Sequence, residues 1–206
     1  MTIMPTMPGI IILAAGASTR LGGNPKQLIV YQGETLLKRT IAAAMSLAES
    51  PENPVPIVVV TGGNQAKIVP ALTNLPVSVV HNEDWQTGMA SSVRVGLSAL
   101  LNDTPDLESV LMLLTDQPHV SPELLRRILA VFRESGRGMA GCEYAGQVGV
   151  PALFARNYFD ELLTLTGDRG AKPLMMKHLA DCAMIPFADG AVDLDTPEDV
   201  ARFLAT

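Results

Sequence analysis

The stretch GIIILAAGASTRLGGNPKQL, residues 9–28, is the most informative part of this 206-residue chain. Its first part, Gly9–Ala14, is a continuous aliphatic run, which is typical of a strand buried on both faces of a sheet. A chain leaving such a strand normally enters a helix within about 2–6 residues. Here it runs instead through small residues, glycines, a proline and two cations, Arg20 and Lys26. The stretch therefore predicts a buried strand followed by a binding loop.

Strand-like and helix-like segments alternate after this loop. Aliphatic runs predict strands, and helical spacing of apolar residues or N-capping signals predict helices. The strands are expected at 9–14, 57–63, 77–82 and 109–118 (the last ending in a turn), and the helices at 34–49, 65–72, 91–101 and 121–134. A β-α repeat of this kind predicts an α/β fold of three layers, with helices on both faces of a mostly parallel sheet.

The pattern changes after Gly136. Residues 138–154 are β-like and punctuated by glycines, which predicts a hairpin or a small antiparallel insertion. Helices are expected near 156–165 and 170–179, short strands near 182–186 and 191–194, and an N-capped final helix in DTPEDVARFLA. We expect one domain over residues 1–206.

Composition and charge exclude several classes of protein. The net charge is −6, whereas a nucleic-acid surface needs clustered Lys and Arg, so we expect no nucleic-acid partner. No apolar run approaches the roughly 20 residues of a membrane helix, and the N-terminus lacks the positive region of a signal peptide. The two cysteines have no CxxC spacing. We therefore expect a cytoplasmic protein with no membrane partner.

The loop after the first strand has the chemistry of a nucleotide site. Ala14–Gly16 carry almost no side chain, so a flat base could lie against their backbone. Glycines such as Gly16, Gly22 and Gly23 can adopt positive φ and wrap an anion with amides. Arg20 and Lys26 suit phosphates. The loop is neither a Walker A loop nor GxGxxG, and the alternative is a glycine-rich surface turn with two solvated cations. We favour a nucleoside triphosphate site.

A triphosphate site needs a divalent metal, and the metal needs carboxylates. Asp116 directly follows an apolar strand and is expected at the same sheet edge as the loop, although it could instead be an ordinary turn residue. Asp193 and Asp195 alternate in VDLDTPEDV, so they share one face of a short strand. For Asp195 an alternative, N-capping of the final helix with Glu198 in its first turn, is favoured. For Asp193 the metal role is favoured.

Other polar residues are weaker candidates for the site. Ser91 and Ser92 stand at the start of a predicted helix and could contact a nucleotide or simply cap the helix. Asn82 ends a predicted strand at the same sheet edge and could contact the base or the acceptor. Asp168 reads as a capping residue, and Lys172 could reach an anionic acceptor.

Six segments together resemble one family. LAAGASTRLGGNPKQL, GETLLKRTI, NEDWQTGMASSVRVGL, LLTDQP, LTGDRGAK and DLDTPEDV occur in the order found in the molybdenum cofactor cytidylyltransferases, a MobA-like group of NTP transferases. The resemblance covers nearly the whole chain and implies a Rossmann-like nucleotidyltransferase fold. It also implies transfer of CMP from CTP to the terminal phosphate of molybdopterin, with Mg²⁺ as cofactor and release of pyrophosphate.

The resemblance also implies roles for individual residues. Arg20 and Lys26 would hold the triphosphate, and Asp116 would bind Mg²⁺ together with Asp193 or Asp195. The base would be lined by Leu13, Ala14, Ala15 and Gly16. The sequence LAAG, rather than LAGG, resembles the cytidine-using branch.

The sequence departs from the pattern of this family at two places, and several alternative functions stay open. LGGNP between Arg20 and Lys26 is one residue longer than in many relatives, and Val150 stands where many have histidine. The alternatives are a guanylyltransferase for the same cofactor, a transferase for another phosphorylated acceptor such as a sugar or methylerythritol phosphate, and a non-catalytic carrier. A carrier would deliver the cofactor to a molybdenum hydroxylase apoenzyme. Some relatives are labelled oxidoreductases, but this sequence has no nicotinamide or flavin fingerprint.

Overall fold

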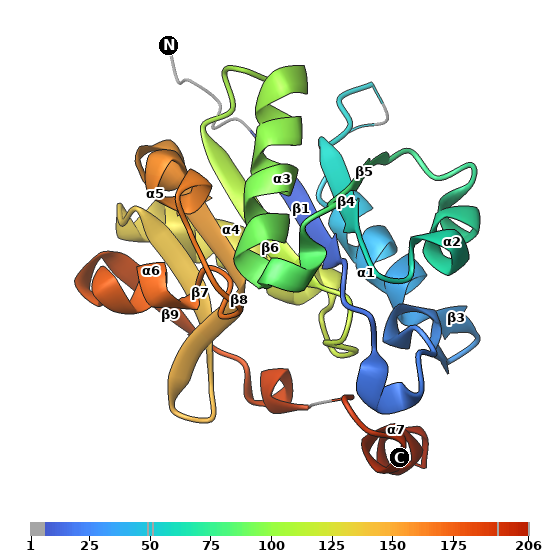
Figure 1. Ribbon diagram of the computed structural model, residues 1–206. Helices are drawn as coiled ribbons and strands as arrows, with labels where there is room; N and C mark the ends of the chain where they lie inside the picture. Colours follow the sequence, from blue (N-terminus) through green and yellow to red (C-terminus); the bar gives the residue numbers. More distant parts are fainter. Residues whose placement is uncertain (1–6, 49, 51, 193, 206) are drawn as a thin grey trace.

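A computed structural model describes residues 7–48, 50, 52–192 and 194–205, and its centre is a seven-stranded sheet (Figure 1). The strand order is β5-β4-β1-β6-β8-β7-β9. The strands are β1 Gly9–Ala14, β4 Ile57–Thr61, β5 Ser78–His81, β6 Ser109–Leu114, β7 Met139–Tyr144, β8 Gln147–Ala155 and β9 Cys182–Pro186. Only β8 runs antiparallel to its neighbours in this sheet, as far as the described residues show. The prediction of a mostly parallel sheet with an antiparallel insertion is confirmed.

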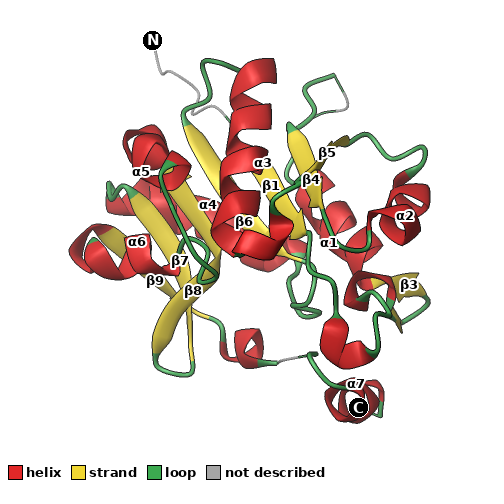
Figure 2. Cartoon of the chain, viewed as in Figure 1, coloured by secondary structure: helices red, strands yellow, loops and turns green. Residues whose placement is uncertain are grey.

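Helices cover both faces of the sheet, which gives the predicted three layers (Figure 2). One face packs against α1 (Leu36–Met45), α2 (Gln65–Ile68) and α4 (Pro122–Ser135). The other packs against α3 (Met89–Asp103), α5 (Phe159–Leu163) and α6 (Lys172–Lys177). Successive side chains of β1 explain this division, because Ile10 and Ile12 enter the first cluster and Ile11 and Leu13 the second. The aliphatic strand β1 in the middle of the sheet therefore contributes side chains to the hydrophobic cores on both faces.

The strand order places the ends of β1 and β6 side by side. β1 pairs in parallel with β4 on one side and β6 on the other, and Leu13 lies opposite Leu114. The chain moves from β1 to β4 and β5 in one direction, then returns to β6 beyond β1. Such a switch point opens a crevice at the carboxyl ends of the strands. The loop after β1 and Asp116, two residues after β6, emerge there together.

A small antiparallel ribbon follows the loop and was not predicted. Its strands are β2 (Val30–Tyr31) and β3 (Glu34–Thr35), and together with α7 (Pro197–Leu204) it packs around a separate apolar cluster. Helix α1 is consequently shorter than the predicted 34–49. It begins after Thr35, whose hydroxyl accepts a hydrogen bond from the Lys38 N–H at 3.3 Å.

Two predictions about the C-terminal segment were wrong. The strand expected near 191–194 does not form among the described residues, because Ala191 ends a short 3₁₀ helix, Ala188–Ala191, and Val192 and Leu194 belong to no strand; Asp193 lies outside the described residues. The N-cap of α7 is Thr196 rather than Asp195, because the Thr196 hydroxyl and the Asp199 carboxylate form a reciprocal capping box. Asp195 is therefore available for another role.

No helix within the described residues is long and apolar enough to cross a membrane.

The central position of β6 predicts a large cost for truncating its core side chains. Leu111 is fully buried, whereas Leu179 on the surface is 43% exposed. We expect Leu111→Ala to lower the free energy of unfolding by about 2–5 kcal/mol, because the change leaves a cavity in a close-packed core. The matched change Leu179→Ala should cost under about 1 kcal/mol. Urea denaturation measures both, and equal losses would contradict this description of the core.

Candidate active site

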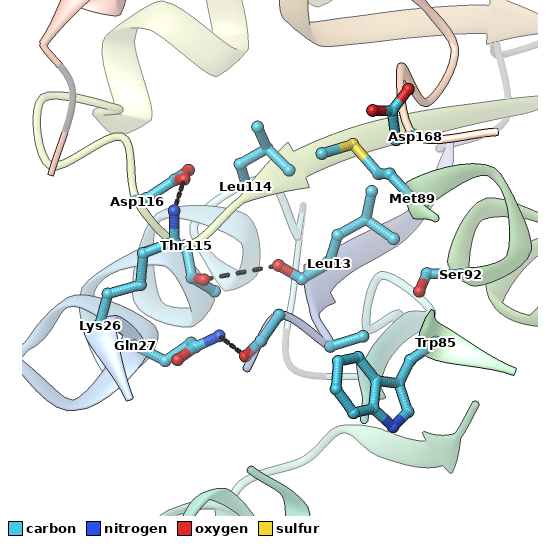
Figure 3. Close-up of a pocket in the computed structure, with 12 residues that line it drawn as sticks. Leu13, Lys26, Gln27, Trp85, Met89, Ser92, Leu114, Thr115, Asp116 and Asp168 are labelled. Carbon is cyan, nitrogen blue, oxygen red and sulfur yellow. Dashed lines mark hydrogen bonds and ion pairs between the residues drawn. The ribbon is translucent and has the colours of Figure 1, made fainter. Parts of the chain in front are cut away.

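A cleft of about 250 Å³ opens at the switch point (Figure 3). Figure 3 shows Lys26, Gln27 and Asp116 on one side of it and Trp85, Met89 and Ser92 on the other. The cleft is lined by Leu13, Ala15, Gly16, Lys26, Gln27, Trp85, Met89, Ser92, Leu114, Thr115, Asp116 and Asp168. Six residues that the sequence assigned to the site thus meet in one hollow: Leu13, Ala15, Gly16, Lys26, Ser92 and Asp116.

A cluster of four charges stands at one end of the cleft. The Lys26 Nζ atom lies 2.5 Å from Asp116 Oδ2 and 2.9 Å from Asp195 Oδ1. Arg20 pairs with the other oxygen of Asp195 at 2.5 Å, and its side chain is 68% exposed. The three remaining side chains are each about four-fifths buried. Asp195 therefore belongs to the site.

Burial and neighbouring charges shift the pKa values of Lys26 and Asp195 in opposite directions. Burial alone lowers the pKa of the Lys26 ammonium, but the charge and hydrogen bond of Asp116, together with those of Asp195, outweigh it and raise that pKa. Burial likewise raises the pKa of Asp195, and its contacts with Lys26 and then Arg20 reverse the shift and lower it. Both groups are thus charged at neutral pH.

The loop after β1 is fixed by the carbonyl oxygens of Leu13 through Gly16. Each oxygen accepts a hydrogen bond from a protein donor, and the donors come from the loop's own end, from the turn after β6 and from the turn after β4. The pairs are Leu13 with Thr115 Oγ1, Ala14 with Gln27 Nε2, Ala15 with the Gly63 N–H, and Gly16 with both Gln27 Nε2 and Asn64 Nδ2. These carbonyls therefore serve to position the loop, a use that the sequence did not reveal.

The second half of the loop curls back through left-handed backbone. Ser18, Gly22 and Gly23 have φ values of 53°, 63° and 76°, whereas Gly16 does not have positive φ. The expectation for Gly22 and Gly23 is confirmed, and that for Gly16 was wrong. The Ser18 hydroxyl accepts a hydrogen bond from the Lys26 N–H at 3.0 Å, which closes the curl and directs the lysine toward Asp116.

A glycine after β4 lets the loop and the single tryptophan approach each other. A Cβ atom on Gly62 would lie 2.6 Å from the Ala15 carbonyl oxygen and 2.8 Å from Trp85 Cβ. No side chain fits there without moving backbone. Gly62 therefore sets the distance between the loop and the Trp85 wall, and hence the width of the cleft.

Asn82, Ser91 and Ser92 form one buried hydrogen-bonded group. Asn82 Nδ2 donates to Ser91 Oγ at 2.7 Å and to Ser92 Oγ at 2.9 Å. Neither serine is an N-cap, because α3 begins at Met89 after Gly88. The single hydroxyl hydrogen of Ser91 is shared between the Gly88 carbonyl at 2.8 Å and the Asp84 carbonyl at 3.1 Å, while Ser92 also lines the cleft. Of the three, the structure brings only Ser92 to the cleft wall.

The turn at Gly167–Asp168 completes the wall beside α3. The Gly167 carbonyl accepts a hydrogen bond from the Ala90 N–H at 3.1 Å. Asp168 does not cap α6, whose N-cap residue is Ala171, and it lines the cleft instead. Lys172 contacts Gln147 on the β7–β8 hairpin. The capping interpretation of Asp168 was therefore wrong.

The charged end of the cleft fits a divalent cation. The Lys26 ammonium already stands as a cation between two carboxylates, and the buried Asp116 Oδ1 has no hydrogen-bond partner among the described residues. Carboxylate oxygens are the ligands that Mg²⁺ prefers, and Mg²⁺ commonly uses one or two of them plus substrate phosphates. Within the described part of the chain no group of three or more His, Cys, Asp or Glu could hold a metal alone. Phosphate oxygens would complete the coordination.

Residues 10–182 match the MobA-like NTP transferase domain. The chain belongs to this family. The nicotine blue oxidoreductase of Paenarthrobacter nicotinovorans is 33% identical over an alignment of 215 positions, which covers 98% of each protein. The crystal structure of Rv0371c from Mycobacterium tuberculosis H37Rv superposes with a TM-score of 0.77 at 32% identity, covering 98% of this chain and 100% of that one. The crystal structure of the manganese complex of Rv0371c superposes with a TM-score of 0.74 at 31% identity, again covering 98% of this chain and 100% of that one.

Membership of the MobA-like family confirms the resemblance and the nucleotidyltransferase class inferred from the motifs. The match begins in β1 and ends at the first residue of β9, so it includes the loop, Trp85 and Asp116. Asp195 lies beyond it. The matched residues thus supply every residue that lines the cleft, and the C-terminal segment adds one carboxylate to the charged cluster.

The lowered pKa of Asp195 predicts how acid affects stability. A carboxyl group with a depressed pKa in the folded state stabilises that state above its unfolded pKa of about 3.9, and this contribution disappears as the pH falls through the folded pKa. We expect Asp195→Asn to lower the free energy of unfolding by about 1–2 kcal/mol at pH 6. The difference from the unsubstituted protein should close toward pH 3. Urea denaturation at both pH values tests this, and a constant difference would contradict it.

Proposed function

We propose that this MobA-like nucleotidyltransferase transfers CMP from CTP to the terminal phosphate of molybdopterin and releases pyrophosphate. The observation that carries the proposal is the cluster of Lys26, Asp116, Asp195 and Arg20 at the end of a largely apolar cleft. One end of this site can neutralise a metal–triphosphate, and the other can enclose a nucleoside. The motifs support the choice of molybdopterin as the acceptor.

The nucleoside would lie between the loop and the Trp85 wall. Ala15 and Gly16 offer a flat surface on one side, and Trp85 and Met89 offer apolar surface on the other. Ser92 adds a hydroxyl that can pair with a polar group of the base or ribose. Most ligand sites combine apolar walls with a few placed polar groups in this way.

On binding of CTP, the cations of the charged cluster would exchange their carboxylate partners for the phosphates of the nucleotide. In the structure Lys26 and Arg20 neutralise two carboxylates. With CTP bound, both cations would pair with phosphate oxygens, and Asp116 and Asp195 would hold Mg²⁺. Every charge keeps an opposite neighbour, so the exchange leaves no buried charge unpaired. Mg²⁺, when bound, supplies charge neutralisation and orientation of the phosphates.

The reaction needs no covalent enzyme intermediate. An oxygen of the acceptor phosphate forms a bond to the α-phosphorus of CTP, and the bond from that phosphorus to the bridging oxygen of the β-phosphate breaks. The electron pair leaves with pyrophosphate, whose charge Arg20 and Lys26 stabilise. Catalysis then rests on positioning and electrostatic stabilisation.

Measuring pyrophosphate release with Mg²⁺ and each of CTP, GTP, ATP and UTP, with and without molybdopterin cofactor, tests the proposal. We expect release with CTP only when the cofactor is present. Release with GTP would keep the mechanism but change the donor. No release from protein that binds the cofactor would favour a carrier that serves a molybdenum hydroxylase.

A second activity is suggested by the name of the Paenarthrobacter relative, an oxidoreductase that is similar over its full length. A test of such an activity in this chain supplies NADH or NADPH as the reductant. Incubation with nicotine blue and either nucleotide measures this directly, because reduced nicotinamide absorbs at a wavelength where the oxidised form does not. We expect no oxidation, since the loop lacks GxGxxG.

Asp116 gives a direct test of the transferase mechanism. We expect Asp116→Asn to lower CTP-dependent pyrophosphate release by about 100-fold or more, because the amide cannot neutralise a metal ion. The variant should still unfold cooperatively, with a melting temperature lowered by several degrees, because the change removes one of the two ion pairs of Lys26. Asp106→Asn, a surface change outside the cleft, is the matched control and should keep full activity. Equal activity of the two variants would contradict the role of Asp116.

Ala15 tests the choice of base. Ala15 lines the cleft, and replacing it by glycine removes a methyl group from the loop against which the base would lie. We expect Ala15→Gly to lower the ratio of kcat/KM for CTP to that for GTP by about 10-fold, the size of effect that a single methyl group has in a binding pocket. Parallel assays with the two nucleotides measure the ratio. An unchanged ratio would show that the base is selected elsewhere.

A further inference from the structure

Asp168 is a carboxylate on the wall of the nucleotide cleft, and the described residues leave it without a partner. It is exposed, so a ligand in the cleft can reach it. Among the described residues no cation stands beside this carboxylate and no hydrogen-bond donor contacts it. The other carboxylate that lines the cleft, Asp116, is paired with Lys26. Of the described residues that line the cleft, Asp168 is therefore the carboxylate that is open to a ligand.

The backbone around Asp168 is fixed against the start of α3. Gly88 has a φ of 113°, and a Cβ atom there would lie 2.8 Å from Asp168 Cα and overlap the Gly167 carbonyl. The Arg94 guanidinium donates a hydrogen bond to the Leu165 carbonyl at the start of the same turn. These contacts hold the main chain, whereas the carboxylate is left free. The position of Asp168 consequently does not depend on any partner of its side chain.

A free carboxylate in a nucleotide cleft selects hydrogen-bond donors. Ionised carboxylate oxygens only accept hydrogen bonds, and they repel phosphate groups, which carry the same charge. A nucleoside triphosphate has donors in two places, the hydroxyl groups of the ribose and the amino group or ring N–H of the base. Asp168 can therefore contact the sugar or the base, but not the triphosphate.

The place of Asp168 in the cleft favours the sugar. Figure 3 shows Asp168 beyond Met89 as seen from Trp85, against which the base would lie. Lys26 and Asp116, which mark the triphosphate end, stand on another side of the cleft. The ribose joins the base to the triphosphate, so its hydroxyl groups would face the remaining wall, to which Asp168 belongs.

We infer that Asp168 accepts hydrogen bonds from the ribose hydroxyl groups and thereby selects ribonucleotides over 2′-deoxyribonucleotides. The inference rests on the proposed function, because that function places the base and the triphosphate. The two oxygens of one carboxylate suit two adjacent hydroxyl groups, and dinucleotide-binding folds also use an acidic residue to bind ribose. A 2′-deoxyribonucleotide loses one of these hydrogen bonds, and hydrogen bonds to a charged group are among the stronger ones.

Titration of the Trp85 fluorescence tests this inference without any turnover, because Trp85 is the single tryptophan and lines the cleft. CTP, 2′-deoxy-CTP and UTP, each with Mg²⁺, are titrated into the unsubstituted protein, Asp168→Ala and Asp168→Asn. We expect the unsubstituted protein to bind CTP about 10- to 100-fold more tightly than 2′-deoxy-CTP. Asp168→Ala should abolish this preference. Asp168→Asn should give an intermediate ratio, because its amide oxygen still accepts a hydrogen bond.

The ratio of two affinities separates hydrogen bonding from a general effect of charge. Removing a negative charge from the cleft favours every nucleoside triphosphate alike, and this gain cancels when CTP is compared with 2′-deoxy-CTP. Asp106→Asn, the surface control, removes the same charge as Asp168→Asn outside the cleft. This control should keep the full preference for CTP.

The outcomes distinguish this inference from the proposed function. Loss of the ribose preference in Asp168→Ala supports the inference even if pyrophosphate is never released. An unchanged preference in Asp168→Ala, or no preference in the unsubstituted protein, would overturn the inference even if the transferase activity is confirmed. A lower ratio of CTP to UTP affinity in Asp168→Ala, with the ribose preference unchanged, would assign the carboxylate to the base and overturn the inference as well.

Discussion

The ammonium group of Lys26 between the carboxylates of Asp116 and Asp195 is the interaction on which the site depends. It joins three parts of the chain that are remote in sequence: the loop after β1, the turn after β6 and the segment before α7. Two partly buried carboxylates repel each other unless a cation stands between them. The lysine therefore holds the site together with a charge of the same sign as that of a metal ion.

The surrounding fold brings these groups to one place. The aliphatic strand β1 is buried between two cores and ends beside β6, so the loop and Asp116 emerge at one edge. Protein donors hold the loop by its carbonyl oxygens, and Gly62 lets it pack closely against the turn after β4. A rigid edge of this kind suits phosphoryl transfer, in which the protein contributes positioning and charge rather than covalent chemistry.

The sequence predicts the parts of the molecule that depend on local patterns and on strand order. Aliphatic runs and helical spacing identify the elements, and parallel strands with a shared edge bring Lys26 toward Asp116. Contacts between distant segments follow no such pattern. Asp195 was misinterpreted as a cap although Thr196 and Asp199 already form the capping box, and Gln27 attracts no attention until the tertiary structure shows it holding two carbonyls of the loop. The first error had a local signal in TPED, whereas Gln27 had none.

The role of Lys26 as a stand-in for a metal is tested most directly by an anomalous difference map from a crystal of the protein grown with CTP and Mn²⁺, which scatters anomalously in place of Mg²⁺. We expect one manganese peak between the carboxylates of Asp116 and Asp195, with the Lys26 ammonium moved onto a phosphate oxygen and the base beside Trp85. A manganese peak away from both carboxylates, or a nucleotide bound while Lys26 still bridges them, would contradict it.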